Sequence, residues 1–140
     1  MVKLIVGVKG TGKTKNLIDM ANEALRISPG NVVCIEKGQK LKYDVKYQAR
    51  LIDTNEYEIN NADALYGLVC GLYAENYDIT HVFIDSALKI CGNDVESFSR
   101  FLKLADDVSD KYKFQCIITA SASPDSLPEE IIKYTKYDKI

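Results

Sequence analysis

One eight-residue segment near the N-terminus constrains the fold of this 140-residue chain more than any other feature. Gly7–Thr14 reads Gly-Val-Lys-Gly-Thr-Gly-Lys-Thr and satisfies the pattern G-x-x-x-x-G-K-[ST] in full. The apolar run Val2–Val6 precedes it and is too short for a helix, so we expect a buried strand there. Apolar residues at helical spacing follow it up to about Ile27. A strand, a glycine-rich turn and a helix are therefore predicted in that order.

The residue types in this segment suit a site for phosphate groups. Gly7, Gly10 and Gly12 allow a tight turn with inward N–H groups, and the first helical turn adds its dipole. Lys13 can reach terminal phosphates as a mobile charge, which makes it a candidate catalytic residue, and the Thr14 hydroxyl can ligate magnesium. The candidate nucleotide-binding residues are Gly7, Gly10, Thr11, Gly12, Lys13, Thr14, Lys15 and, from the far end of the chain, Ser121.

Strand and helix patterns alternate along the rest of the chain. Further strands are predicted at Val32–Glu36, Arg50–Asp53, His81–Asp85 and Lys113–Ala120. Helices are predicted over Asn60–Asn76, from about Asp94 after a capping box Asn93-x-x-Glu96, and from a second capping box Ser126-x-x-Glu129 to about Tyr134. This alternation predicts an α/β chain: a single-domain, three-layer sandwich with a mostly parallel five-stranded sheet over residues 1–140.

Charge, cysteine content and hydropathy exclude several classes. With 18 basic and 20 acidic residues the formal charge is -2, which argues against attraction of the whole domain to nucleic acid or anionic lipid. The four cysteines are far apart and there is one histidine, so we expect free thiols in a reducing compartment instead of a zinc site. The longest apolar stretch, around Tyr66–Ala74, is too short to span a bilayer, and no signal peptide is visible. A cytoplasmic protein without membrane insertion is expected.

On the complete Gly7–Thr14 pattern and its two flanks, the chain resembles the P-loop nucleoside triphosphatases from Val2 to about Ala120. The Gly-Thr-Gly-Lys-Thr string is common in their ATP-using members. The chain is similar in size to small ATP-binding proteins of the additional-acid class, some of which carry a label borrowed from twitching-motility ATPases. That label is not carried over. Motility ATPases need an N-terminal domain and acidic and histidine boxes, for which we expect no room in this chain. The resemblance implies ATP and Mg2+ as cofactors.

Two carboxylates at predicted strand ends are the candidate partners of the loop. Asp85 resembles the aspartate that holds magnesium in these proteins. It is followed by Ser86, where many members with an additional acid carry glutamate, so activation of water must come from elsewhere or be slow. Glu36 is the best substitute, because the recombinase-like branch has its catalytic glutamate in a similar place. The alternative is a rim acid that pairs with Lys37 or Lys40.

Hydroxyl residues lie at the end of the last predicted strand and directly after it. Thr119 or Ser121 resembles the sensor position of the same class and could hydrogen-bond the attacking water or the phosphate. Small hydroxyl residues are also common wherever a strand passes into a turn.

A basic stretch follows the second predicted strand. Its cations are Lys37, Lys40, Lys42, Lys46 and Arg50, and Leu41, Tyr43, Val45 and Tyr47 alternate with polar residues. The alternation predicts an edge strand or ribbon with a basic face. Such lysines either protect an exposed edge or form a docking surface for nucleic acid or an acidic partner.

Three functions are compatible with these residues. The first is magnesium-dependent ATP binding with slow hydrolysis, acting as a switch or assembly ATPase. The second is a small-molecule or nucleotide kinase, which the chain's three arginines and the lack of an arginine-bearing lid disfavour. The third is a non-catalytic nucleotide-binding module of a larger complex, in which a protein partner or a second copy supplies the missing arginine. A last strand lying between the loop strand and the Asp85 strand would indicate the additional-acid class.

Overall fold

The computed structural model describes residues 1–46 and 48–136. Five strands form one sheet: β1 (Val2–Gly7), β2 (Asn31–Glu36), β3 (Arg50–Asp53), β4 (Ile79–Ile84) and β5 (Gln115–Ser121). Their order is β1-β5-β4-β2-β3, and each neighbouring pair in this sheet is parallel. The predicted α/β fold with five strands is confirmed, and the sheet is wholly parallel where the sequence predicted a mostly parallel one.

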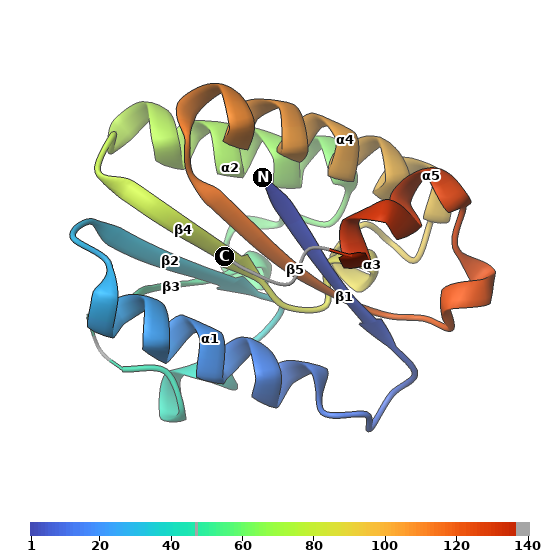
Figure 1. Cartoon of the computed structure of the whole chain (residues 1–140), viewed down its shortest axis with the longest axis horizontal. Coiled ribbons are helices and arrows are strands. Elements are labelled where there is room, and N and C mark those ends of the chain that lie inside the picture. Colours follow the sequence, from blue (N-terminus) through green and yellow to red (C-terminus); the bar gives the residue numbers. More distant parts are fainter. Residues whose placement is uncertain (47, 137–140) are drawn as a thin grey trace.

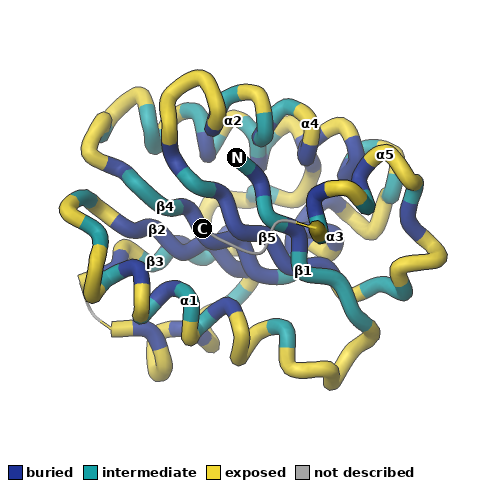
Figure 2. The backbone as a smooth tube through the Cα atoms, in the orientation of Figure 1, coloured by how far each residue is buried: buried dark blue, intermediate teal, exposed yellow. Residues whose placement is uncertain are grey.

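Helices cover both faces of the sheet (Figure 1). Helix α1 (Lys13–Ile27) lies on one face, and α2 (Ala62–Glu75), α4 (Val95–Tyr112) and α5 (Glu129–Ile132) lie on the other. The short helix α3 (Ala87–Ile90) follows β4 directly. Single 3-10 turns are η1 (Leu41–Tyr43), η2 (Thr54–Tyr57), η3 (Pro124–Ser126) and η4 (Lys133–Lys136). Figure 2 shows the resulting three layers, with buried strands between helices that are exposed on their outer sides.

The core is divided by the sheet into two apolar clusters. Under α1, the buried residues Leu17, Ala21 and Ala24 lie at helical spacing and pack on the strands. On the other face, Phe98 and Phe101 of α4 are almost fully buried, in an apolar cluster to which β1, β4 and β5 also contribute. Within the described residues, no helix has the length and apolar character needed to cross a membrane.

The strand order and the parallel pairing determine which residues meet at the edge of the sheet formed by the carboxyl ends of the strands. β5 lies between β1 and β4, which is the arrangement expected for the additional-acid class. Because the strands are parallel, the residues at their carboxyl ends come to one edge of the sheet: Gly7, Glu36, Asp85 and Ser121.

Both predicted capping boxes are wrong. Helix α4 is capped by the Asp94 carboxylate, which accepts from the N–H of Glu96 (3.2 Å), while Asn93 lies in the preceding turn with φ 59°. Ser126 belongs to η3 and donates to the carbonyl of Ser123 (2.7 Å), so α5 begins after Pro128 without a side-chain cap. In both cases the residue at the helix start is not the first residue of the pattern: it is Asp94 before α4 and Pro128 before α5. A four-residue pattern cannot identify which residue occupies that position.

The stretch after β2 is not the predicted edge strand. It contains η1 and turns, and its buried residues are Leu41, Val45 and Ala49, four residues apart. Tyr43, which the alternation placed with Leu41 and Val45, is 80% exposed, and Tyr47 lies outside the described residues. The four-residue spacing of the buried side chains was hidden by the additional tyrosines.

Candidate functional site

The glycine-rich loop joins the carboxyl end of β1 to the first turn of α1. Gly10 and Gly12 have φ of 87° and 85°, a conformation that residues with a Cβ rarely adopt. Gly7 is needed for a different reason, since a Cβ there would lie 2.5 Å from the Thr11 hydroxyl oxygen. Backbone conformation therefore explains the glycines at positions 10 and 12, and close packing explains the glycine at position 7.

The start of α1 lacks a compensating negative group. Gly12 caps it with no side-chain hydrogen bond, and no acidic residue lies in its first turn. Helix N-termini carry unsatisfied N–H groups and a partial positive charge, so this end is suited to an anion. Lys13 adds a full charge beside it, and its Nζ donates to the carbonyl oxygen of Val8 (3.0 Å), to which the Thr11 hydroxyl also donates (2.8 Å).

A buried carboxylate faces the same helical turn. The Thr14 hydroxyl donates to both Asp85 oxygens at 3.2 Å, and the Thr119 hydroxyl donates to Asp85 Oδ1 at 2.7 Å. The N–H of Asp85 donates to the carbonyl of Ile35 (2.9 Å), which continues the pairing of β4 with β2. Thr14 and Asp85 are thus in contact across 71 residues of sequence, as their predicted shared role requires.

Thr119 fixes the turn after β4 as well as the carboxylate. Its hydroxyl oxygen accepts from the N–H of Ser86 (2.8 Å). Ser86 has φ 58°, an unfavourable conformation for a residue with a Cβ, and directly precedes α3 as its N-cap residue. From the sequence, Thr119 and Ser121 were equal candidates for the sensor position. In the structure the Thr119 hydroxyl contacts the Asp85 carboxylate. Ser121 is exposed and is paired in register with Gly7 of β1.

Loss of the Thr119 hydroxyl is expected to destabilise the fold measurably. Thr119→Val would leave the Ser86 N–H and Asp85 Oδ1 each without one partner, which we expect to cost about 2 kcal/mol of unfolding free energy. Thr119→Ser retains the hydroxyl and is expected to lose less than half as much. Urea unfolding of both variants measures the difference. A Thr119→Val protein as stable as the wild type would show that these hydrogen bonds contribute nothing.

Glu36 lies at the same edge, with its carboxylate turned to the backbone that follows it. Oε1 accepts from the N–H of Lys40 (3.1 Å) and Oε2 from the N–H of Leu41 (2.8 Å). Burial raises the pKa of Glu36, Asp85 and Asp53 raise it further, and the two backbone hydrogen bonds act in the opposite direction. The predicted alternative partners, the charged groups of Lys37 and Lys40, form no ion pair with it among the described residues.

Other features lie away from this constellation. Lys15 extends into solvent and pairs with Asp19 (3.1 Å) one turn along α1. The four cysteines, all described, are free thiols. No cluster of three or more His, Cys, Asp or Glu side chains that could hold a metal is found in the described part of the chain. A hollow of about 810 Å3 lies between α2 and α4 and contains none of the predicted site residues.

The comparisons with known proteins support the fold. No family model matches the chain, and no curated protein matches it. Among solved structures it is similar to the flagellar accessory protein FlaH from Methanocaldococcus jannaschii, with a TM-score of 0.62 and 16% identity over 96% of this chain and 66% of that one. It is also similar to domain III of the replication initiation protein DnaA from Thermotoga maritima, with a TM-score of 0.52 and 18% identity over 96% of this chain and 51% of that one.

These likenesses show that the chain has the fold of the P-loop NTPases. The chain spans just under two thirds of the length of the first structure and about half of the second.

Proposed function

We propose that this chain binds ATP with magnesium and hydrolyses it slowly, as a nucleotide-dependent switch or assembly ATPase. The observation that carries the proposal is the contact of the Thr14 hydroxyl with both Asp85 oxygens, at the start of the helix to which the glycine-rich loop leads. Hydroxyl and carboxylate oxygens are ligands that Mg2+ prefers, and proteins usually hold it by one or two such groups together with phosphates. The residues present therefore fit a magnesium nucleotide.

Each residue of the loop has a place in this proposal. The backbone of Gly7, Gly10, Thr11 and Gly12 would surround the phosphates, and Lys13 would exchange its hydrogen bond to Val8 for one to the terminal phosphates. Thr14 and Asp85 would hold magnesium, which neutralises charge on the β- and γ-phosphates when bound. Ser121 would contact the nucleotide from the end of β5, and exposed Lys15 would attract it by charge.

Glu36 is the proposed base for the attacking water. The water oxygen would bond to the γ-phosphorus as the β–γ bridging bond breaks, and Glu36 would take the proton. Its strand pairs directly with the strand that leads to Asp85. Its raised pKa is favourable, because a base is most effective when its pKa approaches the working pH.

Slow turnover follows from what surrounds this site. Ser86 occupies the position after Asp85 and has no base of its own to activate it. The three arginines lie elsewhere. Arg26 is in the last turn of α1 and pairs with Glu23, and Arg100 pairs with Asp63. Arg50 is the first residue of β3, at the amino edge of the sheet. An arginine is worth 10³–10⁵ in rate in related chemistry, so a protein partner or a second copy would accelerate the reaction by supplying one.

The placement of β5 between β1 and β4 supports the additional-acid class of ATPases. Residues 1–140 would then act as one nucleotide-binding domain.

One observation favours a second candidate, a nucleotide-binding module without turnover. Both Glu36 oxygens already accept backbone N–H groups, so the carboxylate is occupied in holding η1. In that case the site would bind nucleotide and the chain would lack a base.

Phosphate release from ATP by the purified chain separates these functions. We expect release without any added acceptor, and we expect it to stop when magnesium is removed with a chelator. Nucleotide binding without release would favour the non-catalytic module. Transfer of γ-label to an added nucleoside or metabolite, with no release in its absence, would establish a kinase and contradict the proposal.

A further inference from the structure

The connection between β2 and β3 concentrates positive charge on an acidic protein. We call residues 37–46 and 48–50 the basic crossover. Its cations, Lys37, Lys40, Lys42, Lys46 and Arg50, are all exposed. With Asp44 the stretch has a net charge of +4, although the whole chain has -2. The charge is therefore local, a distribution that the overall composition conceals.

One of these cations makes a side-chain hydrogen bond: Lys42 Nζ donates to Gln39 Oε1 (3.2 Å). None of the five makes an ion pair with another described residue. By contrast, Lys15, Arg26, Arg100 and Lys103 each pair with a carboxylate elsewhere on the surface. The positive charge of the basic crossover is thus available to a partner.

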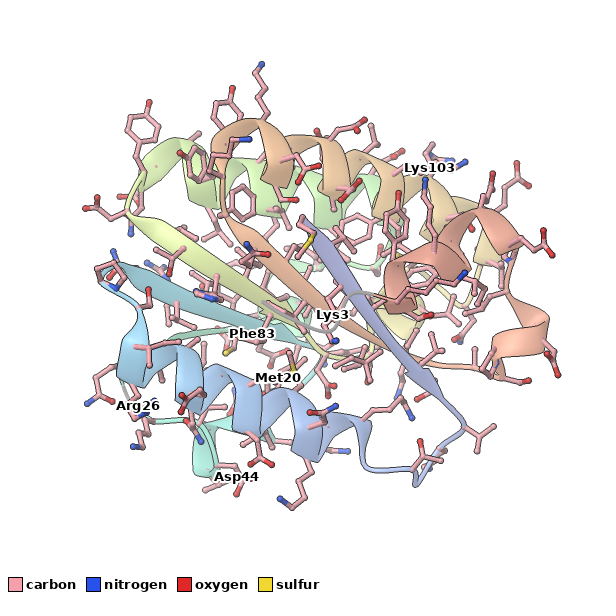
Figure 3. All side chains as sticks on the ribbon, viewed as in Figure 1. Lys3, Met20, Arg26, Asp44, Phe83 and Lys103 are labelled. Atoms are coloured by element: carbon pink, nitrogen blue, oxygen red, sulfur yellow. The ribbon has the colours of Figure 1, made fainter. Side chains whose placement is uncertain are left out.

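The backbone that carries these cations is held in place. Leu41, Val45 and Ala49 are buried under α1. The Asn22 side chain of α1 donates to the carbonyl of Asp44 and accepts from the N–H of Lys46, both at 3.0 Å. Figure 3 shows Asp44 beside α1, on the opposite side of the molecule from Lys103. Because β2 and β3 are parallel, the basic crossover runs from the carboxyl edge of the sheet back to the amino edge.

Exposed aromatic rings accompany the charge. Tyr43 is 80% exposed, and the Lys42 ammonium lies 5.1 Å from its ring centroid. Tyr57 is 62% exposed and lines a hollow of about 190 Å3 together with Lys42 and Gln39 and with the carboxylates of Glu36, Asp53 and Glu56. Tyr43 lies among lysines that have no ion-pair partner, and Tyr57 shares its hollow with one of them, Lys42. Both rings offer flat, solvent-facing surfaces on which bases can stack.

From this combination we infer that the basic crossover binds single-stranded nucleic acid. Lysines neutralise phosphates without reading sequence, and aromatic rings stack on unpaired bases, which a duplex does not expose. An acidic peptide would satisfy the lysines and leave the rings without a function. The expected binding is weak, tolerant of sequence and strongly dependent on salt.

The surface is also connected to the candidate site. The Glu36 carboxylate accepts the N–H groups of Lys40 and Leu41, where the basic crossover enters η1. A nucleic-acid strand bound over Lys40 and Lys42 would change the hydrogen bonds between the Glu36 carboxylate and the backbone at the start of η1. This consequence rests on the proposed function, and it predicts that a bound strand changes the rate of phosphate release.

The test measures fluorescence anisotropy of a labelled twenty-nucleotide oligothymidylate with the full chain, without ATP. Lys42→Glu is compared with Lys111→Glu, because each lysine lies over a neighbouring tyrosine ring, at 5.1 Å and 5.2 Å. Tyr43→Ala is compared with Tyr77→Ala, because these rings are 80% and 76% exposed. The two controls line the same hollow, which lies away from the basic crossover: Lys111 is in α4, the helix that carries Lys103, and Tyr77 follows α2.

We expect Lys42→Glu to weaken binding about tenfold and to lower the salt slope by about 0.7 for each phosphate that the variant no longer neutralises. Tyr43→Ala is expected to weaken it at least about fivefold, and both controls to change it less than twofold. No binding by the wild type at 50 mM salt would overturn the inference. Equal losses in variants and controls, or displacement by polyglutamate but not by unlabelled oligothymidylate, would also overturn it.

A parallel assay separates this inference from the proposed function. Phosphate release is measured with and without the oligonucleotide for the wild type and Lys42→Glu, and the variant is expected to keep its basal rate and lose the response. Release without oligonucleotide binding would overturn the binding surface alone. Oligonucleotide binding without release would overturn the ATPase proposal and leave the surface standing.

Discussion

Replacement of Lys13 by alanine is expected to abolish phosphate release from magnesium ATP. The variant removes the positive charge of the first residue of α1. This charge lies at the start of the helix, which has no side-chain cap and where the γ-phosphate would lie. Loss of one preorganised donor to developing charge typically costs about 10²–10³ in rate, and the variant also binds the ground-state phosphates less tightly. Because Lys13 is only half-buried and its ammonium bonds only to the carbonyl of Val8 among the described residues, its removal should leave the unfolding free energy nearly unchanged.

Lys9→Ala is the matched control for this variant. Lys9 is an exposed cation of the same loop, at a position where the pattern accepts any residue. We expect less than about a threefold change in its rate, as is usual for loss of one exposed charge. Equal losses in both variants would mean that the loop acts through general positive charge. If Lys13→Ala released phosphate as fast as the wild type, the loop would have no role in the reaction.

Glu36→Gln is expected to remove hydrolysis while ATP affinity stays largely intact. Loss of a positioned base costs about 10²–10⁴ in rate, whereas the phosphates would be held by the loop. The substitution also has a structural effect: glutamine has one acceptor oxygen, so its amide group would face the N–H of Lys40 or of Leu41. We expect that mismatch to cost about 1–2 kcal/mol of unfolding free energy.

A comparison of rates with folded fractions separates the two effects of Glu36. Loss of release in fully folded Glu36→Gln with normal ATP binding would support its role as the base. An unchanged rate would exclude Glu36 from the reaction and leave it as the residue that holds η1.

The raised pKa of Glu36 adds a dependence on pH. Hydrolysis should fall as pH is lowered through a pKa above the ordinary value of 4.5, because the protonated carboxyl cannot accept a proton. For stability the sign is opposite. The folded state holds this proton more tightly than the unfolded state does, so this contribution is greatest below pH 4.5 and is lost as pH rises through the folded pKa. The difference in unfolding free energy between wild type and Glu36→Gln, followed against pH, isolates it.

Local chemistry explains why the loop and the strands could be predicted from the sequence. Gly10 and Gly12 are required by backbone conformation at their own positions, and the strands are continuous apolar runs. The contact between Thr14 and Asp85 followed from strand polarity once a parallel sheet was assumed. These features depend on neighbours in sequence or on one general property of the fold.

Features that depend on tertiary contacts were not predictable. Thr119 could not be separated from Ser121, because the distinction depends on which strand lies beside β4. The backbone partners of Glu36 depend on η1, which the alternation of apolar residues presented as a strand. In both cases the sequence indicates the residue type, and packing between distant segments decides its partner.

Thermal unfolding with and without nucleotide tests most directly whether the glycine-rich loop binds magnesium ATP, on which the proposed function depends. A ligand that binds the folded state alone stabilises it by about 2.7 kcal/mol at one hundred times its Kd. We predict a saturable rise in Tm for the wild type, a smaller rise when magnesium is chelated, and none for Lys13→Ala. An unchanged Tm in the wild type, or the same rise in wild type and Lys13→Ala, would contradict binding of the nucleotide by this loop.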